Sequence, residues 1–183
     1  GSTLIHNVAP WEGIFRDGDA ALAQTLHEHG IKLIDERFFQ NYGTFMDQYY
    51  ARLDPQETKE TTAIIALENM LAQKGFPAID HGILRAGLDA MYNVINKNWA
   101  LEDDAIPALA TLRKFGYVLG LISNTSDDKH VQNIIDETGL RPYFDLVITS
   151  AAFGYRKPDR KIFEAGMNVL NVTAAETAMV GDS

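Results

Sequence analysis

The sequence contains no cysteine, which excludes disulfide bonds, thiolate zinc sites and cysteine nucleophiles together. It also lacks any apolar run approaching the ~18 residues that a membrane-spanning helix requires. The first residues carry no basic segment followed by an apolar one, which a secretory signal would need. We therefore expect a protein without a membrane partner and, by default, a cytoplasmic location.

Positive charge is scarce as well, because 16 Lys and Arg residues stand against 25 Asp and Glu residues, for a formal net charge of -9. A chain of this charge gains no long-range attraction to a nucleic-acid backbone or to an anionic membrane. We expect no nucleic-acid partner, and an anionic substrate would need a local positive site. The 46% of hydrophobic and 22% of charged residues are typical of a folded globular protein.

The first half of the chain has a helical pattern from about residue 13 to residue 98. Leu22, Leu26 and Ile31 recur at near-helical spacing, and the apolar residues between Phe38 and Tyr49 do the same. These repeats predict a bundle of helices.

Local signals indicate where two elements begin or end. Asp54, Pro55 and Glu57 supply an N-cap, a proline at the first helical position and a glutamate at N3, which predicts a helix start near Gln56. Gly75 marks the other end of that helix. Further along, the segment 173–176 is typical of a capping box.

After Leu101 the pattern changes, and short apolar runs alternate with helical stretches. This alternation implies a parallel sheet covered by helices on both faces. We predict an α/β fold with a Rossmann-like core formed by residues 1–12 and 99–183, into which a helical domain of residues 13–98 is inserted. The predicted strands span 117–122, 146–149 and 177–180, and the predicted helices between them span 127–138 and 161–170.

Polar residues follow each of these strands. Ligands of a doubly wound sheet bind beyond the carboxyl ends of its strands, which directs attention to segments 123–125, 154–158 and 181–183. Hydroxyls and backbone N–H groups at the start of a helix suit a phosphate oxygen, a lysine neutralises a phosphoryl group, and a carboxylate holds Mg2+. Each residue also has an ordinary structural explanation, as a helix cap, a solvated lysine or a loop aspartate.

Taken together, three motifs resemble those of the haloacid dehalogenase superfamily in order and spacing. "LISNT" is similar to its second motif, "GYRKPDRKIF" to its third and "VGDS" to its fourth. The resemblance implies a hydrolase with a type 1 helical cap, most simply a Mg2+-dependent phosphatase acting on a small phosphorylated substrate. By the same resemblance the site residues are Ser123 and Lys157 as catalytic residues, Asn124, Thr125 and Thr3 as substrate-binding residues, and Asp182 as a Mg2+ ligand.

The opening "GSTLI" resembles the tail of the family's first motif. In that motif the nucleophilic aspartate stands two residues before the position of Gly1 and forms an aspartyl phosphate. Gly1 itself occupies the place of a second aspartate that serves as general acid and base in many family members. Members of the family usually place a further metal-binding carboxylate a few residues after the position of Asp182. We therefore expect the natural protein to be longer than these 183 residues.

Two alternatives remain open at this point. A haloacid dehalogenase uses the same aspartate to displace halide from carbon and needs no magnesium. A non-catalytic or truncated member of the family would use the fold for binding or structure. Neither the substrate nor the oligomeric state follows from the sequence.

Overall fold

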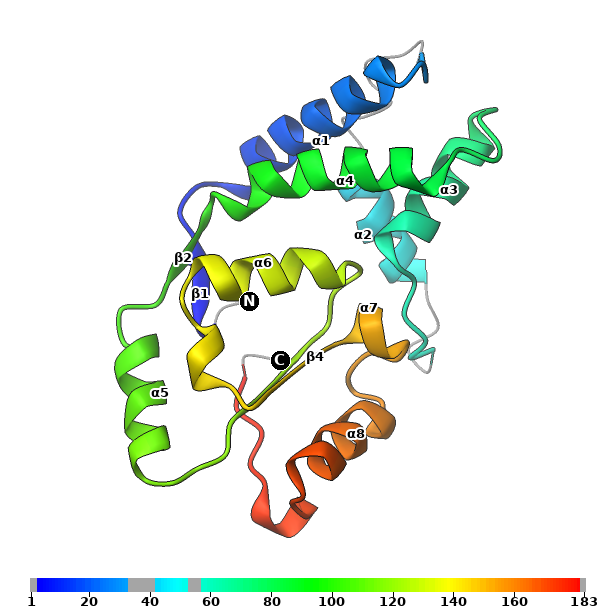
Figure 1. The fold of residues 1–183 in the computed structure, drawn as a ribbon. Helices are drawn as coiled ribbons and strands as arrows, with labels where there is room; N and C mark the ends of the chain where they lie inside the picture. The colour runs from blue at the N-terminus through cyan, green and yellow to red at the C-terminus, as the bar shows by residue number, and fades with distance from the viewer. Residues whose placement is uncertain (1–2, 33–41, 53–56, 182–183) are drawn as a thin grey trace. The chain divides into compact units, whose positions relative to one another are not determined.

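The structure is a computed structural model that describes residues 3–32, 42–52 and 57–181. It contains both helices and a parallel pair of strands, in agreement with the predicted α/β class (Figure 1). Among the described residues, no helix combines the length and the apolar character needed to cross a lipid bilayer.

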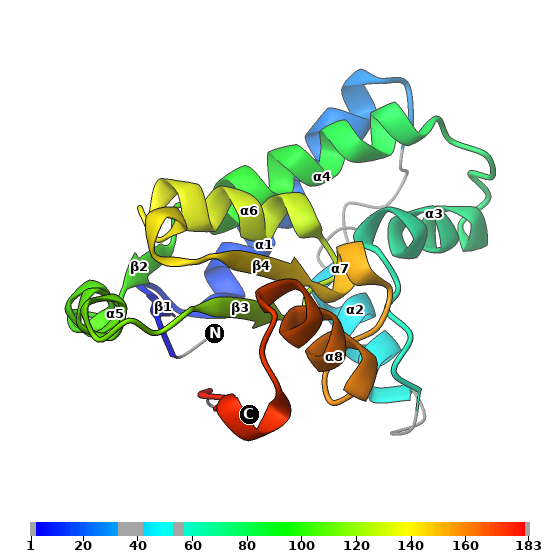
Figure 2. The same cartoon turned by 60° about the horizontal axis from the view of Figure 1, so that its bottom comes forward.

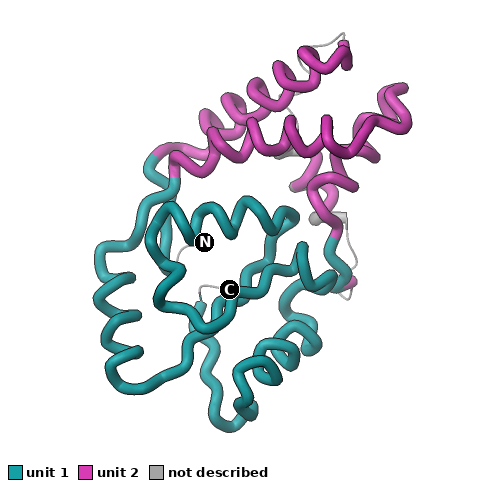
Figure 3. Tube along the Cα trace, in the orientation of Figure 1, with its two compact units in different colours: residues 1–8, 58–60, 99–183 teal, residues 9–57, 61–98 magenta. Residues whose placement is uncertain are grey.

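The chain divides into two compact units (Figure 3). An α/β unit comprises residues 1–8, 58–60 and 99–183, and a helical unit comprises residues 9–57 and 61–98. The segment 58–60 therefore belongs to the α/β unit, although the sequence on both sides of it belongs to the helical unit.

The sheet of the α/β unit is built on two parallel strands, β3 (Gly120–Ser123) and β4 (Leu146–Thr149). They pair in register from Gly120 opposite Leu146 to Ser123 opposite Thr149. The prediction for β4 is confirmed at both ends. The prediction for β3 is right in place, but the strand begins at Gly120, because Tyr117 to Leu119 form a connection after the turn at Gly116.

Helices cover both faces of this pair, as the alternating pattern predicted (Figure 2). Successive strand residues point to opposite faces. Leu121 and Val147 pack with Ile135 of α6 (Asp128–Glu137) on one face. On the other face, Gly166 of α8 (Arg160–Leu170) lets the helix approach closely, since a Cβ atom there would lie 3.4 Å from the Ile122 Cδ1 atom. Both helices begin within one residue of their predicted starts.

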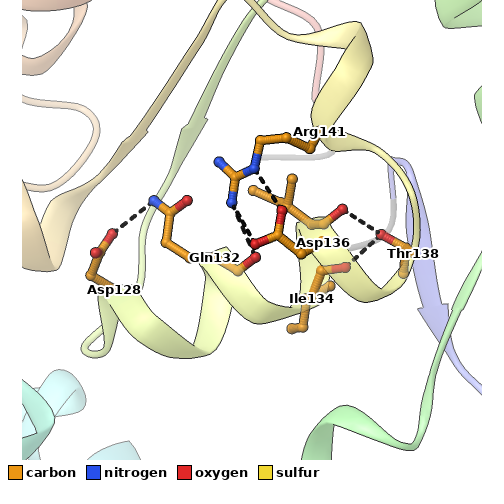
Figure 4. Close-up of polar contacts among 7 residues, drawn as sticks. Asp128, Gln132, Ile134, Asp136, Thr138 and Arg141 are labelled. Atoms are coloured by element: carbon orange, nitrogen blue, oxygen red, sulfur yellow. Dashed lines mark hydrogen bonds and ion pairs between the residues drawn. The ribbon is translucent and has the colours of Figure 1, made fainter.

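Polar side chains fix both ends of α6, and Figure 4 shows the contact between Asp136 and Arg141 at its C-terminal end. Asp127 is the N-cap and accepts a hydrogen bond of 3.0 Å from the His130 N–H. Beyond the C-terminus, the Arg141 Nε donates to the Asp136 Oδ1 at 2.8 Å. This bond, helped by the positive charge of Arg141, holds the pKa of the Asp136 carboxyl below its ordinary value. The cap and the ion pair explain why the predicted helix 127–138 stops where it does.

The rest of the α/β unit consists of short elements. The capping box is confirmed, because the Thr173 N–H donates to the Glu176 carboxylate at 2.9 Å and the Thr173 hydroxyl accepts the N3 backbone N–H. The remaining elements are β1 (Ile5–Asn7) antiparallel to β2 (Trp99–Leu101), α5 (Ala105–Lys114), η2 (Arg141–Tyr143), α7 (Ser150–Phe153) and η3 (Ala174–Glu176).

The strand predicted at 177–180 is wrong, because the structure has no regular element there. A strand needs a neighbour for its backbone N–H and C=O groups, and no strand within the described ranges pairs with this segment. Met179 and Val180 are instead 54% and 77% exposed.

The helical unit is held by one apolar core. Its most extensive helix–helix contact joins α1 and α4. Gly87 allows close packing there, since a Cβ atom on it would lie 2.6 Å from the Leu22 Cδ1 atom. Leu22 and Leu26, which carried the helical prediction, are fully buried. Its helices are α1 (Trp11–Glu28), α2 (Tyr42–Arg52), α3 (Ala63–Gln73) and α4 (His81–Asn96).

The helix predicted to start near Gln56 begins later. Residues 53–56 lie outside the described residues, and α3 starts only at Ala63, because segment 58–60 is extended and bridges to Tyr155. Tertiary pairing has overridden a local helix signal. The predicted end is confirmed: α3 stops at Gln73, and Gly75 follows with a φ of +89°.

Candidate active site

The two motif loops meet at one edge of the α/β unit. Because β3 and β4 are parallel and in register, Ser123 and Thr149 end side by side. The loop after Ser123 leads into α6, and the chain after Thr149 enters the short helix α7 and then the loop that carries Lys157. The second and third motifs therefore lie together at the carboxyl ends of the two strands, as the sequence predicted.

Asn124 ties these two loops directly. Its Oδ1 accepts a hydrogen bond of 2.7 Å from the Lys157 N–H, and its Nδ2 donates one of 3.0 Å to the Lys157 carbonyl. The side-chain amide thus holds the backbone of Lys157 on both sides. The peptide bond between Lys157 and Pro158 is cis.

Ser123 and Lys157 keep their reactive groups available. Both residues are half-buried. Within the part of the chain that the structure describes, the Ser123 hydroxyl and the Lys157 ammonium make no hydrogen bond or ion pair. A donor and a cation near one loop junction are the groups that a phosphoryl oxygen would need.

Thr125 makes hydrogen bonds to Ser150 and Asp127. Its N–H donates to the Ser150 Oγ at 2.8 Å. Its hydroxyl accepts from the Asp127 N–H at 3.1 Å and contacts the Asp127 carbonyl at 3.2 Å. These bonds shape the turn that leads into the N-cap of α6, so the hydroxyl of Thr125 supports the turn in this structure.

The Lys157 loop is anchored at its far end by Asp159, the N-cap of α8. The Asp159 carboxylate accepts hydrogen bonds from the Thr58 hydroxyl at 2.5 Å and from the Lys161 N–H at 2.8 Å. These bonds, the first above all, hold the pKa of Asp159 below its ordinary value. The loop starts at Gly154, whose φ of +91° is a conformation that favours glycine.

The other predicted site residues fall elsewhere. Thr3 lies in an exposed turn before β1. Asp182, the predicted Mg2+ ligand, lies outside the described residues, as does Gly1. Over the described ranges, no three His, Asp or Glu side chains gather closely enough to hold a metal ion. Mg2+ usually takes one or two protein carboxylates and completes its coordination with water and substrate phosphates, so the assignment of Asp182 stays a prediction.

Sequence reasoning missed Ser150 and Glu60. Ser150 is fully buried directly after β4, so the strand-end rule could have drawn attention to it. Glu60 is also buried, but it lies in a stretch whose local signals indicated a helix, and no sequence signal connects it to residues some 90 positions away.

Comparisons with known proteins agree with this fold. The family described as haloacid dehalogenase-like hydrolase matches residues 2–183. A crystal structure of a phosphatase of this superfamily from Thermococcus onnurineus superposes with a TM-score of 0.59 at 24% identity, covering 100% of this chain and 74% of that one. The fold is of the α/β class, and the family match shows that the chain belongs to the haloacid dehalogenase-like hydrolases.

Two relatives illustrate the similarity in sequence. Haloacid dehalogenase-like hydrolase domain-containing protein 3 from Bos taurus is 38% identical over 85 residues, which are 46% of this chain and 33% of that protein. Glyceraldehyde 3-phosphate phosphatase from Methanocaldococcus jannaschii is 33% identical over 103 residues, 56% of this chain and 45% of the relative. The matches thus span less than half the length of either relative.

Proposed function

We propose that the protein is a magnesium-dependent phosphatase that hydrolyses a small phosphorylated metabolite. The observation that carries this proposal is the pair of hydrogen bonds between the Asn124 side chain and the Lys157 backbone. They join the loops that bear the Ser123 hydroxyl and the Lys157 ammonium. Phosphoryl transfer depends mainly on positioning and on stabilising negative charge, and these two groups supply both.

Each residue receives a role from the motif that it matches. The Ser123 hydroxyl donates to a phosphoryl oxygen, and Lys157 neutralises charge on the phosphoryl group and its nucleophile. Asn124 holds the two loops together. Thr125 and Thr3 are assigned to substrate binding. A small phosphorylated substrate is also supported by the relative that is named a glyceraldehyde 3-phosphate phosphatase.

The covalent step requires an aspartate two positions before Gly1. In the proposed reaction its carboxylate oxygen attacks phosphorus, the bond to the leaving oxygen breaks, and water then hydrolyses the aspartyl phosphate. We assign Asp182 as one Mg2+ ligand from its "VGDS" context. When bound, the ion would offset negative charge on the phosphoryl oxygens.

We further propose that residues 13–98 act as a cap domain over this chemistry. A cap excludes water from the reacting groups and selects the substrate. The core would then consist of residues 1–12 and 99–183, together with residues 58–60 of the α/β unit.

The full-length protein tests the proposal with p-nitrophenyl phosphate. Turnover is expected with Mg2+ and is expected to disappear with a chelator. Lys157→Ala should lower kcat/KM by roughly 100-fold or more, because a charge-stabilising group is removed from the transition state. Lys114→Ala, which removes an exposed lysine at the end of α5, is the matched control and should leave the rate unchanged.

Three outcomes would contradict the proposal. A residue other than aspartate two positions before Gly1 would exclude the covalent mechanism. Chelator-insensitive turnover, or equal rates for Lys157→Ala and Lys114→Ala, would exclude the assigned site. Release of halide from a 2-haloacid without Mg2+, and no release of phosphate, would favour the dehalogenase alternative.

A further inference from the structure

A short segment between α2 and α3 returns to the α/β unit, where it contacts the Lys157 loop and the buried Ser150. We call residues 58–60 the strap (Figure 3). Its backbone pairs with the start of the Lys157 loop, because the Glu60 N–H donates to the Gly154 carbonyl at 2.9 Å and the Arg156 N–H donates to the Thr58 carbonyl at 2.7 Å. The strap is thereby fixed as an antiparallel bridge beside Tyr155.

The Glu60 side chain enters the interior from this strap. Glu60 is 8% exposed, and its Oε2 lies 2.6 Å from the hydroxyl oxygen of Ser150, which is fully buried. The same hydroxyl oxygen lies 2.8 Å from the Thr125 nitrogen and 3.0 Å from the Thr125 carbonyl oxygen. Ser150 therefore stands between the carboxylate of the strap and the turn that follows Ser123.

The chemistry of the three groups decides the direction of the bonds. The Thr125 N–H can only donate, so the Ser150 oxygen must accept from it. Ser150 has one proton, for which the Glu60 carboxylate and the Thr125 carbonyl compete. A hydrogen bond to a carboxylate is the stronger of the two, so the proton goes to Glu60 and the lone pairs of Ser150 remain directed at the Thr125 N–H.

We propose that Glu60 is a positioning residue for the phosphoryl site: its carboxylate orients the Ser150 hydroxyl, which holds the Thr125 N–H and so fixes the turn behind Ser123. The inference rests on the proposed phosphatase function only for its effect on rate. The chain of hydrogen bonds from Glu60 to Thr125 is a property of the folded protein and can be measured without substrate.

Loss of the Glu60 carboxylate should loosen the turn at Thr125 and thereby lower kcat. Without Glu60, the Ser150 proton turns toward the Thr125 carbonyl, and the Thr125 N–H loses a well-oriented acceptor. The peptide units on both sides of Thr125 become less restrained. Because transition-state stabilisation depends on donors that are held in place, kcat should fall more than KM rises.

The experiment compares Glu60→Ala, Ser150→Ala and their combination in the full-length protein. Two quantities are measured: kcat and KM for p-nitrophenyl phosphate, and the exchange rate of the Thr125 amide hydrogen by NMR. Each single variant should lower kcat by roughly 5-fold to 100-fold, the effect of leaving a buried polar partner unsatisfied. The combination should be no worse than either single variant, because both act through one chain of bonds.

Two further variants separate positioning from general stability. Glu60→Gln keeps an oxygen that accepts the Ser150 proton and should restore kcat to within about 3-fold of the wild type. Glu57→Ala removes an exposed carboxylate just before the strap and should change neither quantity. If Glu60→Ala does not fold, Glu60→Asp withdraws the carboxylate by one methylene and should reproduce the loss.

The Thr125 amide should exchange at least about 10-fold faster in Glu60→Ala and in Ser150→Ala than in the wild type. Unchanged exchange and unchanged kcat in both variants would overturn the inference, as would additive losses in the combination. Absence of turnover in the wild type would instead refute the phosphatase proposal, while the exchange measurement would still decide the role of Glu60.

Discussion

In the α/β unit, the four described polar residues that are buried as whole residues each make a side-chain hydrogen bond, whereas in the helical unit Asp19 Oδ1 and both polar atoms of the Asn96 side chain have none. The first group shapes loops at the strand ends. The second group carries a desolvation cost that surrounding apolar packing must offset. The buried polar residues of the α/β unit are Glu60, Asp127, Thr149 and Ser150.

The contrast indicates that the two units are stabilised by different means. The helical unit has a large cluster of fully buried leucines, and its polar exceptions weaken it. The α/β unit has a smaller buried cluster around Ile135 and depends more on specific hydrogen bonds. Three substitutions can test this difference, and they are ordered by the size of the expected effect.

Leu22→Ala should cause the largest loss. The side chain is fully buried against α4, where Gly87 has no side chain that could fill the space left behind. Removing it should lower the free energy of unfolding by about 2 to 5 kcal/mol. Urea denaturation followed by circular dichroism measures the change. A loss under about 1 kcal/mol would show that the apolar core of the helical unit is not its main support.

Asp19→Asn should raise the free energy of unfolding instead of lowering it. Burial raises the pKa of Asp19 to about 7, although the Tyr42 backbone N–H bonded to its carboxylate works against this shift. The folded state therefore holds its proton where the unfolded chain has released it, and this group makes stability fall as the pH rises from about 4 to about 7.

The amide side chain of the variant cannot ionise, so its stability should no longer fall between about pH 4 and about pH 7. At pH 8 the free energy of unfolding should be about 1 to 3 kcal/mol higher than in the wild type. Chemical denaturation of both proteins at pH 5, 6, 7 and 8 provides the comparison. Parallel curves would mean that the carboxyl is solvated when ionised. Asp17→Asn, an exposed carboxylate on the same helix, is the control.

Thr149→Val should have the smallest effect of the three. Thr149 is 1% exposed, donates to the Asp128 carboxylate at 2.7 Å and accepts the Ala152 N–H at 3.2 Å as the N-cap of α7. Valine keeps the shape but leaves both partners unsatisfied, which should cost about 1 to 2 kcal/mol. Thermal unfolding detects the loss. A neutral result would remove the basis for contrasting the two units.

The sequence predicted those elements whose signals are local. The limits of β4, α6 and α8 followed from apolar runs, an aspartate cap and helical spacing, all of which act within a few residues. The strand predicted at 177–180 failed because an apolar run forms a strand only when a neighbour pairs with it. The helix start near Gln56 failed because the strap pairs with the Lys157 loop instead.

The candidate site was predictable as a set of strand-end loops, since parallel strands bring their carboxyl ends to one edge. How those loops are held was not predictable. The bond between Asn124 and Lys157 joins residues 33 positions apart, and the bond between Ser150 and Glu60 joins residues 90 apart. Such pairings depend on the completed fold, and no periodicity or cap signal encodes them. The assigned roles of Ser123, Lys157 and Asp182 remain predictions.

The strap also limits how freely the family's inserted helical domain can be exchanged. If residues 13–98 were replaced by the corresponding insertion of a relative, the Gly154 carbonyl and the Ser150 hydroxyl would lose the partners that Glu60 provides. A chimera would therefore have to retain the strap within the foreign helices. In this chain the insertion is not an interchangeable module, because three of its residues are part of the core that it interrupts.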